Sequence, residues 1–411
     1  MKKVLLVVID GLSDRGSKTP LSSAKKPNMD RLAEMGINGI MDTIAPGVRP
    51  GSDTGHLALL GYDPYEYYTG RGPIEAAGAG IDVKPGDIAF RVNFGTVEGE
   101  GSVFDKVVVD RRAGRISDTD ELVKAVNEGI DLSEFGVEFV FRRGSGHRGA
   151  LVFRGKNLSD KITDTDPHKV GEKVQRCRPL SDDESARRTA KIVNYFMEKA
   201  HEILDRHPLN EERAKKGLPK ANVLLLRGVG RVPHIPPFES RYGMKLAVIA
   251  GTTLIKGIGR ILGGDVIEVE GATGSKNTNV KGKIEAALKA LETHDFVLLH
   301  FKATDELGHD GDFEGKREFI EKLDTHFEPL LKLDFSKVCL IVTADHSTPV
   351  TAKEHTGDPV PIVIVHEGVR VDDVKSFDEF SACKGGLCRI RGLDLMNIVT
   401  DLIDRAEKFG A

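Results

Sequence analysis

Aspartate and histidine side chains follow two apolar runs of this chain, where a parallel sheet would gather them at one edge. Asp10 comes directly after the run at residues 3–9, and Asp345 and His346 closely follow the run VCLIV in the sequence VTADHST. Open parallel sheets bind their ligands beyond the carboxyl ends of the strands. These three side chains are therefore candidates for a ligand or metal site.

A second group of the same residue types comes from two other segments. Asp305 follows the run FVLLHF, and His309 lies four residues later, so that a helical turn places both side chains on one face. His355 lies in the loop KEHTGD before the run VPIVIV. Carboxylates combined with imidazoles favour divalent manganese, zinc, cobalt or iron, whereas an all-oxygen set would indicate magnesium.

Each of these residues also has an ordinary structural explanation. An aspartate after a strand often caps a helix or forms a turn, and a single histidine is more often a surface or packed residue than a ligand. The spacing of Asp305 and His309 alone occurs by chance in many proteins. The joint pattern is more specific, because the sites coincide with ends of predicted parallel strands and include Asp/His pairs. Together they indicate a metal site.

Ser52 is the candidate nucleophile. The sequence PGSDTGH precedes the apolar helical segment LALLGY, which predicts Ser52 at the N-cap, where backbone N–H groups favour anions. The alternative is that Ser52 only caps this helix. Beside a divalent cation, a serine alkoxide is a competent nucleophile, because the metal lowers the pKa of the hydroxyl.

The elements that must position these residues alternate between strands and helices. Continuous apolar runs, typical of parallel strands buried on both faces, cover residues 3–9, 245–249, 296–301, 338–342 and 360–365. Helical patterns cover residues 281–291, 315–331 and 393–408. This alternation predicts an α/β fold with a mainly parallel sheet.

The middle of the chain has a different pattern. Short alternating strands punctuated by turns occupy about residues 87–155, and an amphipathic helix is predicted at 183–206. We interpret this region as an α+β domain inserted into the α/β domain, with joints where Pro and Gly cluster near 84–86 and 233–237. The predicted domains are a discontinuous catalytic domain, 1–84 and 237–411, and an inserted substrate-positioning domain, 85–236.

Composition argues against several classes of protein. A chain of 411 residues favours two domains, and its net charge of −4 gives no general attraction to nucleic acid. No run of about 18 apolar residues is present, so we expect no membrane span. Asp10 and Gly11 end the first apolar run too soon for a signal peptide. The four cysteines form no disulfide framework for a chain of this length, which favours a reducing cytoplasm.

Five motifs carry a resemblance to a known family. They are MKKVLLVVIDGLSD, PGSDTGHLALLGY, KATDELGHDGD, VTADHSTP and KEHTGDPVPI, and in combination they resemble the alkaline phosphatase superfamily. More narrowly, the chain resembles the archaeal type of cofactor-independent phosphoglycerate mutases, through further stretches such as GYDPYEYYTGRGPIEAAG and NVLLLRGVGRVPHIP. This resemblance runs from the first strand to the last helix. It implies a three-layer phosphatase-like α/β domain with a smaller inserted α+β domain.

The resemblance also implies two divalent metal ions, manganese, cobalt, zinc or magnesium. One ion would be held by Asp10, Ser52, Asp345 and His346, and the other by Asp305, His309 and His355. Reasoning from the residues alone does not sort these ligands between two metals.

For the substrate, the resemblance implies residues of the inserted domain and one lysine of the catalytic domain. The residues are His147 near the transferring phosphoryl group, Arg227 and Arg231 for phosphate or carboxylate, and Lys256 at the phosphoserine. The insert is shorter than in bacterial members, and some of their phosphate-holding arginines have no clear counterpart. Candidates to substitute for them are Arg142, Arg143 and Arg148, with Asp164 and Asp166 for acid–base help. The alternative for each Arg or Lys is a solvated surface charge.

The expected reaction is the interconversion of 3-phosphoglycerate and 2-phosphoglycerate, small-molecule substrates of glycolysis and gluconeogenesis, in the cytoplasm. Ser52 would carry the phosphoryl group without 2,3-bisphosphoglycerate, because the chain has no Arg-His-Gly setting for a phosphohistidine. The nearer alternative is another phosphatase, phosphodiesterase or phosphopentomutase of the superfamily. The more distant one is a non-enzymatic metal-binding protein, which would have no need of Ser52.

Overall fold

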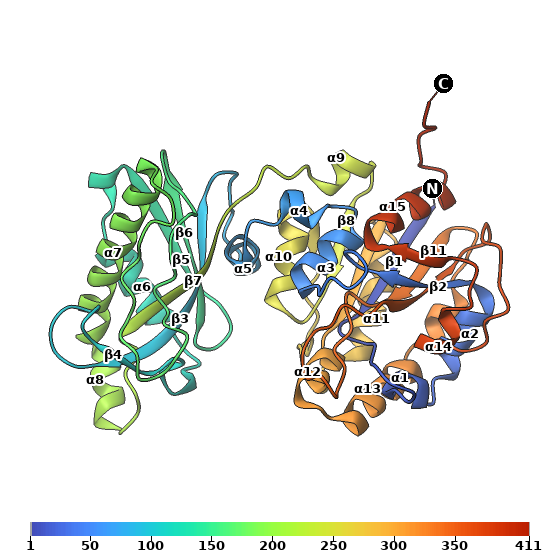
Figure 1. Ribbon diagram of the computed structural model, residues 1–411, viewed down its shortest axis with the longest axis horizontal. Helices are drawn as coiled ribbons and strands as arrows, with labels where there is room; N and C mark the ends of the chain where they lie inside the picture. The colour runs from blue at the N-terminus through green and yellow to red at the C-terminus, as the bar shows by residue number, and fades with distance from the viewer. Residues whose placement is uncertain (1, 411) are drawn as a thin grey trace. The chain divides into compact units, whose positions relative to one another are not determined.

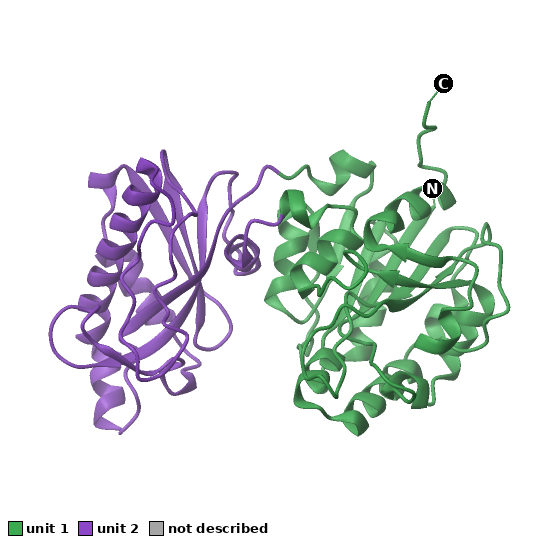
Figure 2. Ribbon diagram, in the orientation of Figure 1, with its two compact units in different colours: residues 1–67, 235–411 green, residues 68–234 purple. Residues whose placement is uncertain are grey.

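A computed structural model describes residues 2–410, which divide into two compact units (Figure 2). Unit 1 comprises residues 1–67 and 235–411, and unit 2 comprises residues 68–234. The second boundary falls within the predicted joint at 233–237, whereas the first lies earlier in the chain than the predicted joint near 84–86. Among the described residues, none of the helices combines the length and hydrophobicity that crossing a membrane requires.

Unit 1 is an α/β fold built on an eight-stranded sheet (Figure 1). β1 (Lys3–Ile9) pairs in parallel with β10 (Phe296–Phe301) on one side and with β11 (Val338–Thr343) on the other. The strand order is β13-β2-β12-β11-β1-β10-β8-β9, with β2 at Ile37–Asp42, β8 at Leu246–Ile249, β9 at Asp265–Val266, β12 at Val360–Val365 and β13 at Cys388–Arg391. β12 is antiparallel to both of its neighbours, and the remaining pairs in this sheet are parallel. The expected mainly parallel sheet is therefore confirmed.

Helices cover both faces of this sheet, which explains why its central strands are continuously apolar. All six residues of β10 and of β11 are buried. The helices are α1 (Pro20–Ser23), α2 (Pro27–Met35), α3 (Ser52–Leu59), α4 (Pro64–Tyr67), α9 (Phe238–Tyr242), α10 (Thr253–Ile261), α11 (Val280–Ala290), α12 (Ala303–Asp310), α13 (Phe313–Thr325), α14 (Glu379–Ala382) and α15 (Gly392–Leu402). Figure 1 shows α3, α10 and α15 on one side of the sheet and α2 and α13 on the other.

Two of the predicted helices end earlier than expected. The pattern at 315–331 divides into α13 and the 3₁₀ helix η3 (Glu328–Lys332), because Pro329 has no backbone N–H to continue an α-helix. The pattern at 393–408 ends at Leu402, and Asp404 adopts a left-handed backbone conformation with φ of 60°.

Unit 2 is an α+β fold around five antiparallel strands. The long strand β3 (Ile88–Glu98) pairs with β4 (Val107–Asp110), β6 (Arg148–Gly155) and β7 (Val223–Arg231), and β5 (Val137–Arg143) pairs with β6. One face of the sheet packs Phe90 and Phe153 against Phe196 of α7 (Glu184–Asp205) in the main core. The remaining helices are α5 (Arg71–Gly78), α6 (Asp120–Gly129), α8 (Pro208–Lys215), η1 (Ala113–Arg115) and η2 (Ser133–Phe135).

α5 explains why unit 2 begins before the predicted joint. It covers the other face of the sheet, where Ala76 packs with Ala89 and Val152 in a small second core. The approach is closest at Gly72, where a Cβ would lie 2.1 Å from the carbonyl oxygen of Ala89. Only glycine fits there, so the segment is held against β3 by backbone contact.

Candidate active site

The nucleophile candidate Ser52 lies beside Asp10 at the carboxyl end of the central strand. Asp10 is the first residue after β1 and is fully buried, because its backbone N–H donates to Phe301 of β10 and keeps it in the sheet. The Ser52 Oγ atom lies 3.4 Å from Asp10 Oδ1 and 3.2 Å from His346 Nε2.

Ser52 does not cap its helix, contrary to the prediction from the sequence. Gly51 occupies the N-cap position, and Ser52 is the first residue of α3. The local hydrogen bond that closes this end runs from the Gly51 backbone N–H to Thr54 Oγ1, at 2.9 Å. The Ser52 hydroxyl is thus left to face the aspartate and histidine side chains, which argues against a purely structural role as a cap.

Asp345 and His346 reach the same point from the end of β11. Both are fully buried, and ligand atoms of Asp10, Asp345 and His346 all lie within 4.8 Å of one another. Asp345 Oδ2 is buried without a hydrogen-bond partner among the described residues. It lies 3.3 Å from His346 Nε2 and 3.4 Å from His56 Nδ1. A buried carboxylate oxygen without a hydrogen bond is costly, and a divalent cation would satisfy it.

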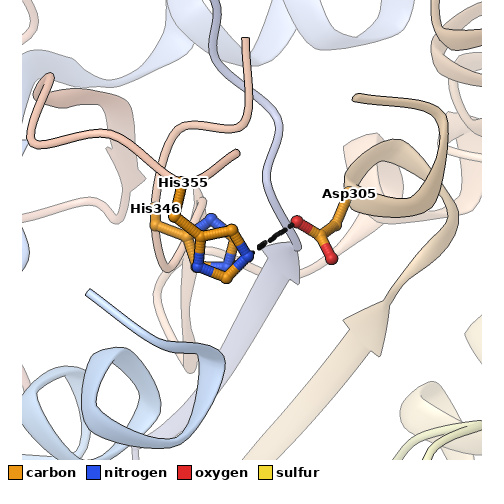
Figure 3. Close-up of side chains that lie close together, drawn as sticks. All are labelled: Asp305, His346 and His355. Atoms are coloured by element: carbon orange, nitrogen blue, oxygen red, sulfur yellow. Dashed lines mark ion pairs between the residues drawn. The ribbon is translucent and has the colours of Figure 1, made fainter. Parts of the chain in front are cut away.

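The second group forms around Asp305 in α12. Asp305 Oδ1 lies 3.2 Å from His355 Nε2 and 3.4 Å from His309 Nε2. Figure 3 shows Asp305 facing the rings of His346 and His355, which stack with centroids 3.6 Å apart. His346 therefore lies between the two groups. Glu354, which the sequence analysis did not single out, is an exposed neighbour of His309 and His355 within 4.8 Å.

Hydrogen bonds orient all three imidazoles with Nε2 available as a ligand. His309 Nδ1 lies 3.0 Å from the Lys353 carbonyl oxygen and His355 Nδ1 lies 2.8 Å from that of Pro50, so each Nδ1 carries the proton and donates it. The Thr348 hydroxyl donates to Asp305 Oδ1 at 2.6 Å and accepts from His346 Nδ1 at 3.0 Å. Such outer contacts are typical of metal-binding histidines, and the residues present therefore fit a divalent metal site.

The electrostatics of the first group indicate a proton that a dication would replace. Burial, together with the negative charge of Asp10, raises the pKa of Asp345 to about 6. Burial opposes the charged form of His346, but the carboxylates of Asp345 and Asp10 outweigh it and raise the pKa of His346 to about 9. Burial also opposes the charge on Asp10, yet Lys302 and a hydrogen bond from His300 hold the pKa of Asp10 well below its usual range.

Lys302 is a functional candidate that the sequence analysis missed. Its Nζ lies 3.2 Å from Ser52 Oγ and 3.0 Å from Asp10 Oδ1. Lys256, the lysine that the resemblance implies at the phosphoserine, instead forms an ion pair with Glu268 at 2.5 Å. A lysine directly after a strand has no distinguishing pattern, and only its place three residues before Asp305 in the motif KATDELGHDGD could have drawn attention to it.

In unit 2, His147 and Arg227 lie among several arginines. His147 lies in the turn between β5 and β6, and burial together with Arg148, Arg112 and Arg227 lowers its pKa to about 4. Arg227 on β7 is 3.9 Å from Asp166 Oδ2, and its Nε has no hydrogen-bond partner among the described residues.

Other residues named from the sequence are committed to structural contacts. The Arg231 guanidinium donates to the backbone carbonyls of Leu158 and Gly86, so it holds these two segments together. Arg142 donates to the Gly80 carbonyl at 2.9 Å, and Arg143 forms an ion pair with Asp120 at 2.8 Å.

The two acidic candidates of the inserted unit are also engaged. Asp164 accepts from the Gly228 backbone N–H and lies 3.0 Å from His168 Nε2. Asp166 is fully buried and accepts two hydrogen bonds from Arg111, at 3.0 and 2.6 Å.

Two arginines missed by the sequence analysis complete the charged region of unit 2. Arg91 on β3 lies directly opposite Arg227 on β7, and its pKa is lowered to about 10 by burial and by the neighbouring Arg71. Glu75 of α5 holds both side chains, at 3.0 Å from Arg71 Nε and 3.4 Å from Arg91 Nε. More guanidinium groups than carboxylates are gathered here, which favours an anionic ligand. For Arg91, the available signal was an arginine inside the mainly apolar strand IAFRVNF.

The fold and the strand-end cluster define a two-unit protein, an α/β unit with a serine and candidate metal ligands at the carboxyl edge of its sheet and an inserted α+β unit. A family model described as 2,3-bisphosphoglycerate-independent phosphoglycerate mutase matches residues 33–210. A protein of that name from Archaeoglobus fulgidus is 69% identical over 410 residues, covering 99% of this chain and 100% of the relative. One from Methanopyrus kandleri is 53% identical over 420 residues, covering 100% of this chain and 98% of the relative. The chain therefore belongs to the 2,3-bisphosphoglycerate-independent phosphoglycerate mutases, a family of isomerases.

Solved structures agree with this assignment. A cofactor-independent phosphoglycerate mutase from Thermoplasma acidophilum is 42% identical with a TM-score of 0.75, covering 98% of this chain and 100% of the other. A protein from Pyrococcus horikoshii is 40% identical with a TM-score of 0.84, covering 100% of this chain and 99% of the other. The resemblance to the cofactor-independent phosphoglycerate mutases is confirmed.

Proposed function

We propose that this protein interconverts 3-phosphoglycerate and 2-phosphoglycerate through a phosphoserine at Ser52, in the cytoplasm, as a step of glycolysis and gluconeogenesis. Membership of the family supports the reaction. The observation that carries the mechanism is the position of Ser52 Oγ. This hydroxyl does not cap the helix, and it lies within 3.4 Å of His346, Lys302 and Asp10.

Two divalent ions would be held by the two groups of candidate ligands. One set is Asp10, Ser52, Asp345 and His346, and the other is Asp305, His309 and His355. When bound, such ions lower the pKa of a serine hydroxyl and neutralise charge on phosphoryl oxygens. The mixture of carboxylates and imidazoles favours manganese, cobalt or zinc over magnesium.

The chemical steps conserve the phosphoryl group. A bond forms between Ser52 Oγ and phosphorus as the ester P–O bond at carbon 3 breaks, and the proton lost by the serine is balanced by the one that the released hydroxyl of glycerate gains. The hydroxyl at carbon 2 then takes the phosphoryl group, and Ser52 regains its proton. No 2,3-bisphosphoglycerate is required, because the serine itself stores the group between the two transfers.

The arginines of unit 2 would bind the anionic groups of phosphoglycerate. Arg227 Nε makes no hydrogen bond among the described residues and has Asp166 Oδ2 3.9 Å away. Arg91 and Arg71 are held in place by Glu75, so these guanidiniums are pre-organised for carboxylate or phosphate. His147 beside them is neutral at pH 7, because its pKa is lowered to about 4 by burial and adjacent arginines. It can therefore accept or donate one hydrogen bond without adding charge.

The test is an assay of purified protein with manganese or cobalt and 3-phosphoglycerate, without added 2,3-bisphosphoglycerate. We expect 2-phosphoglycerate as the product and loss of activity on chelation. Ser13→Ala is the matched control for Ser52→Ala, because the Ser13 hydroxyl is buried in unit 1 without a hydrogen-bond partner among the described residues. Release of inorganic phosphate as the main product would show a phosphatase instead, and full activity after complete removal of metal would rule out the two-metal scheme.

A further inference from the structure

Lys302 contacts both groups of metal-ligand candidates. It lies between β10 and α12, and its side chain is 19% exposed. Its Nζ contacts Asp10 Oδ1 at 3.0 Å and Asp305 Oδ2 at 2.5 Å, one carboxylate from each group. The Lys302 carbonyl accepts from the Asp305 backbone N–H at 3.0 Å, so the lysine is fixed to the start of the helix that carries Asp305.

A permanent cation in this place opposes the binding of divalent metals. Two carboxylates that contact an ammonium group are partly neutralised, and like charges repel at these distances. If the site served only to hold two dications, a neutral residue in place of Lys302 would therefore give a higher metal affinity. Its presence calls for a negative charge that enters the site in addition to the carboxylates.

The phosphoserine supplies that charge. Three buried carboxylates, Asp10, Asp305 and Asp345, together with two divalent ions and Lys302, give a net charge of about +2, and a phosphate monoester carries about −2. The site is then neutral when the phosphoryl group is on Ser52, whereas without the lysine it would carry about −1. The contact of 3.2 Å between Lys302 Nζ and Ser52 Oγ places the ammonium group beside the oxygen that accepts phosphorus.

We propose, on the basis of the proposed function, that Lys302 is a catalytic residue that binds the phosphoryl group while Ser52 carries it. As the Ser52 Oγ–P bond forms and the substrate ester bond breaks, the ammonium group donates a charged hydrogen bond to a phosphoryl oxygen and keeps its own protons. The same contact stabilises the phosphoserine until the glycerate hydroxyl takes the group back. Lys302, rather than Lys256, is then the lysine of the phosphoserine.

The decisive experiment compares Lys302→Met with wild type in three measurements: turnover, the fraction of Ser52 phosphorylated in acid-quenched reactions by mass spectrometry, and manganese affinity by calorimetry. We expect kcat to fall by about 10²–10³-fold, the magnitude typical of removing one transition-state donor. The phosphorylated fraction should fall with it, while manganese should bind at least as tightly as in wild type. Lys302→Arg, which keeps the charge, should recover part of the turnover.

Controls separate this inference from the proposed function. Lys281→Met removes an exposed lysine of α11, 3.7 Å from Glu285, and should leave all three measurements unchanged. If wild type itself shows neither mutase turnover nor phosphorylated Ser52, the proposed function fails. If wild type passes, the role of Lys302 is overturned by wild-type turnover in Lys302→Met, by a tenfold loss of manganese affinity there, or by a larger loss of phosphoserine in Lys256→Met. Should Lys302→Met fail to fold, Lys302→Gln is tested by the same criteria.

Discussion

Thr348 offers a test of how the protein prepares its metal ligands before any metal arrives. Its buried hydroxyl accepts from His346 Nδ1 at 3.0 Å and donates to Asp305 Oδ1 at 2.6 Å, so one side chain orients a ligand of each group. Thr348→Val keeps the shape of the side chain and removes both hydrogen bonds. The His346 ring then loses the contact that directs its Nε2 toward Asp10 and Ser52.

The magnitude follows from those two contacts. Loss of an outer partner of a metal-binding histidine typically costs about 10–100-fold in metal affinity, which corresponds to about 1.4–2.8 kcal/mol. The metal-free protein should also lose about 1–3 kcal/mol of unfolding free energy, because a buried N–H is left unpaired.

The assay is manganese titration of the metal-free protein by calorimetry, together with chemical denaturation. Thr343→Val is the matched control, since the Thr343 hydroxyl is equally buried but donates to the Pro361 carbonyl at 3.0 Å and touches none of the ligands. We expect it to lose comparable stability and to keep wild-type manganese affinity. Wild-type affinity in Thr348→Val, or an equal loss of affinity in both variants, would refute the orienting role.

Four further outcomes are expected. Ser52→Ala should abolish mutase turnover with a change of less than about 1 kcal/mol in stability, because the hydroxyl caps no helix; wild-type turnover in this variant would exclude Ser52 as nucleophile. Labelled 3-phosphoglycerate should keep its phosphoryl label in the presence of excess unlabelled 2,3-bisphosphoglycerate, and dilution of the label would contradict a carrier within the protein. The pKa of His346 is raised to about 9 from 6.5, so the stabilisation from its charge is present below pH 6.5 and lost toward pH 9. The melting temperature of the metal-free protein should therefore fall as the pH rises from 6.5 to 9, and an increase would contradict the raised pKa. Arg91→Met should raise KM for 3-phosphoglycerate about tenfold or more, and an unchanged KM would remove Arg91 from substrate binding.

The residues at the strand ends show how much of the site could be predicted from the sequence. Asp10 and Asp345 are 335 positions apart, yet each follows a continuous apolar run, and parallel neighbours in a sheet end at the same edge. Local pattern therefore predicted both the α/β class and the candidates at that edge. The same reasoning could not show that His346 lies between the two ligand groups, because that depends on how its ring stacks on His355.

Helix and strand context decided the details that local pattern left open. The N-cap of α3 is Gly51 and not the predicted Ser52. Sequence signals for helix ends do not resolve a shift of one residue. Arg227 and Arg231 lie on one strand, four residues apart, but the pairing of β7 with β3 is irregular between them, opposite Ala89 and Arg91. The two side chains have different contacts, since Arg231 donates to backbone carbonyls, whereas Arg227 Nε makes no hydrogen bond among the described residues and lies 3.9 Å from Asp166.

The sequence by itself determined the family, the alternation of the main strands and helices, and the residue types at the strand ends, because these follow from local periodicity and short motifs. It did not show that the run at 360–365 is antiparallel to both of its neighbours. Only the tertiary structure decided which charges meet. Lys302 and Lys256 both follow strands of the same sheet, but the first faces Ser52 and the second faces Glu268. Arg71 and Arg91 are brought together by Glu75 from a helix that the sequence had assigned to the other domain. Coulomb interactions act through space, and the packing of separate elements sets those distances.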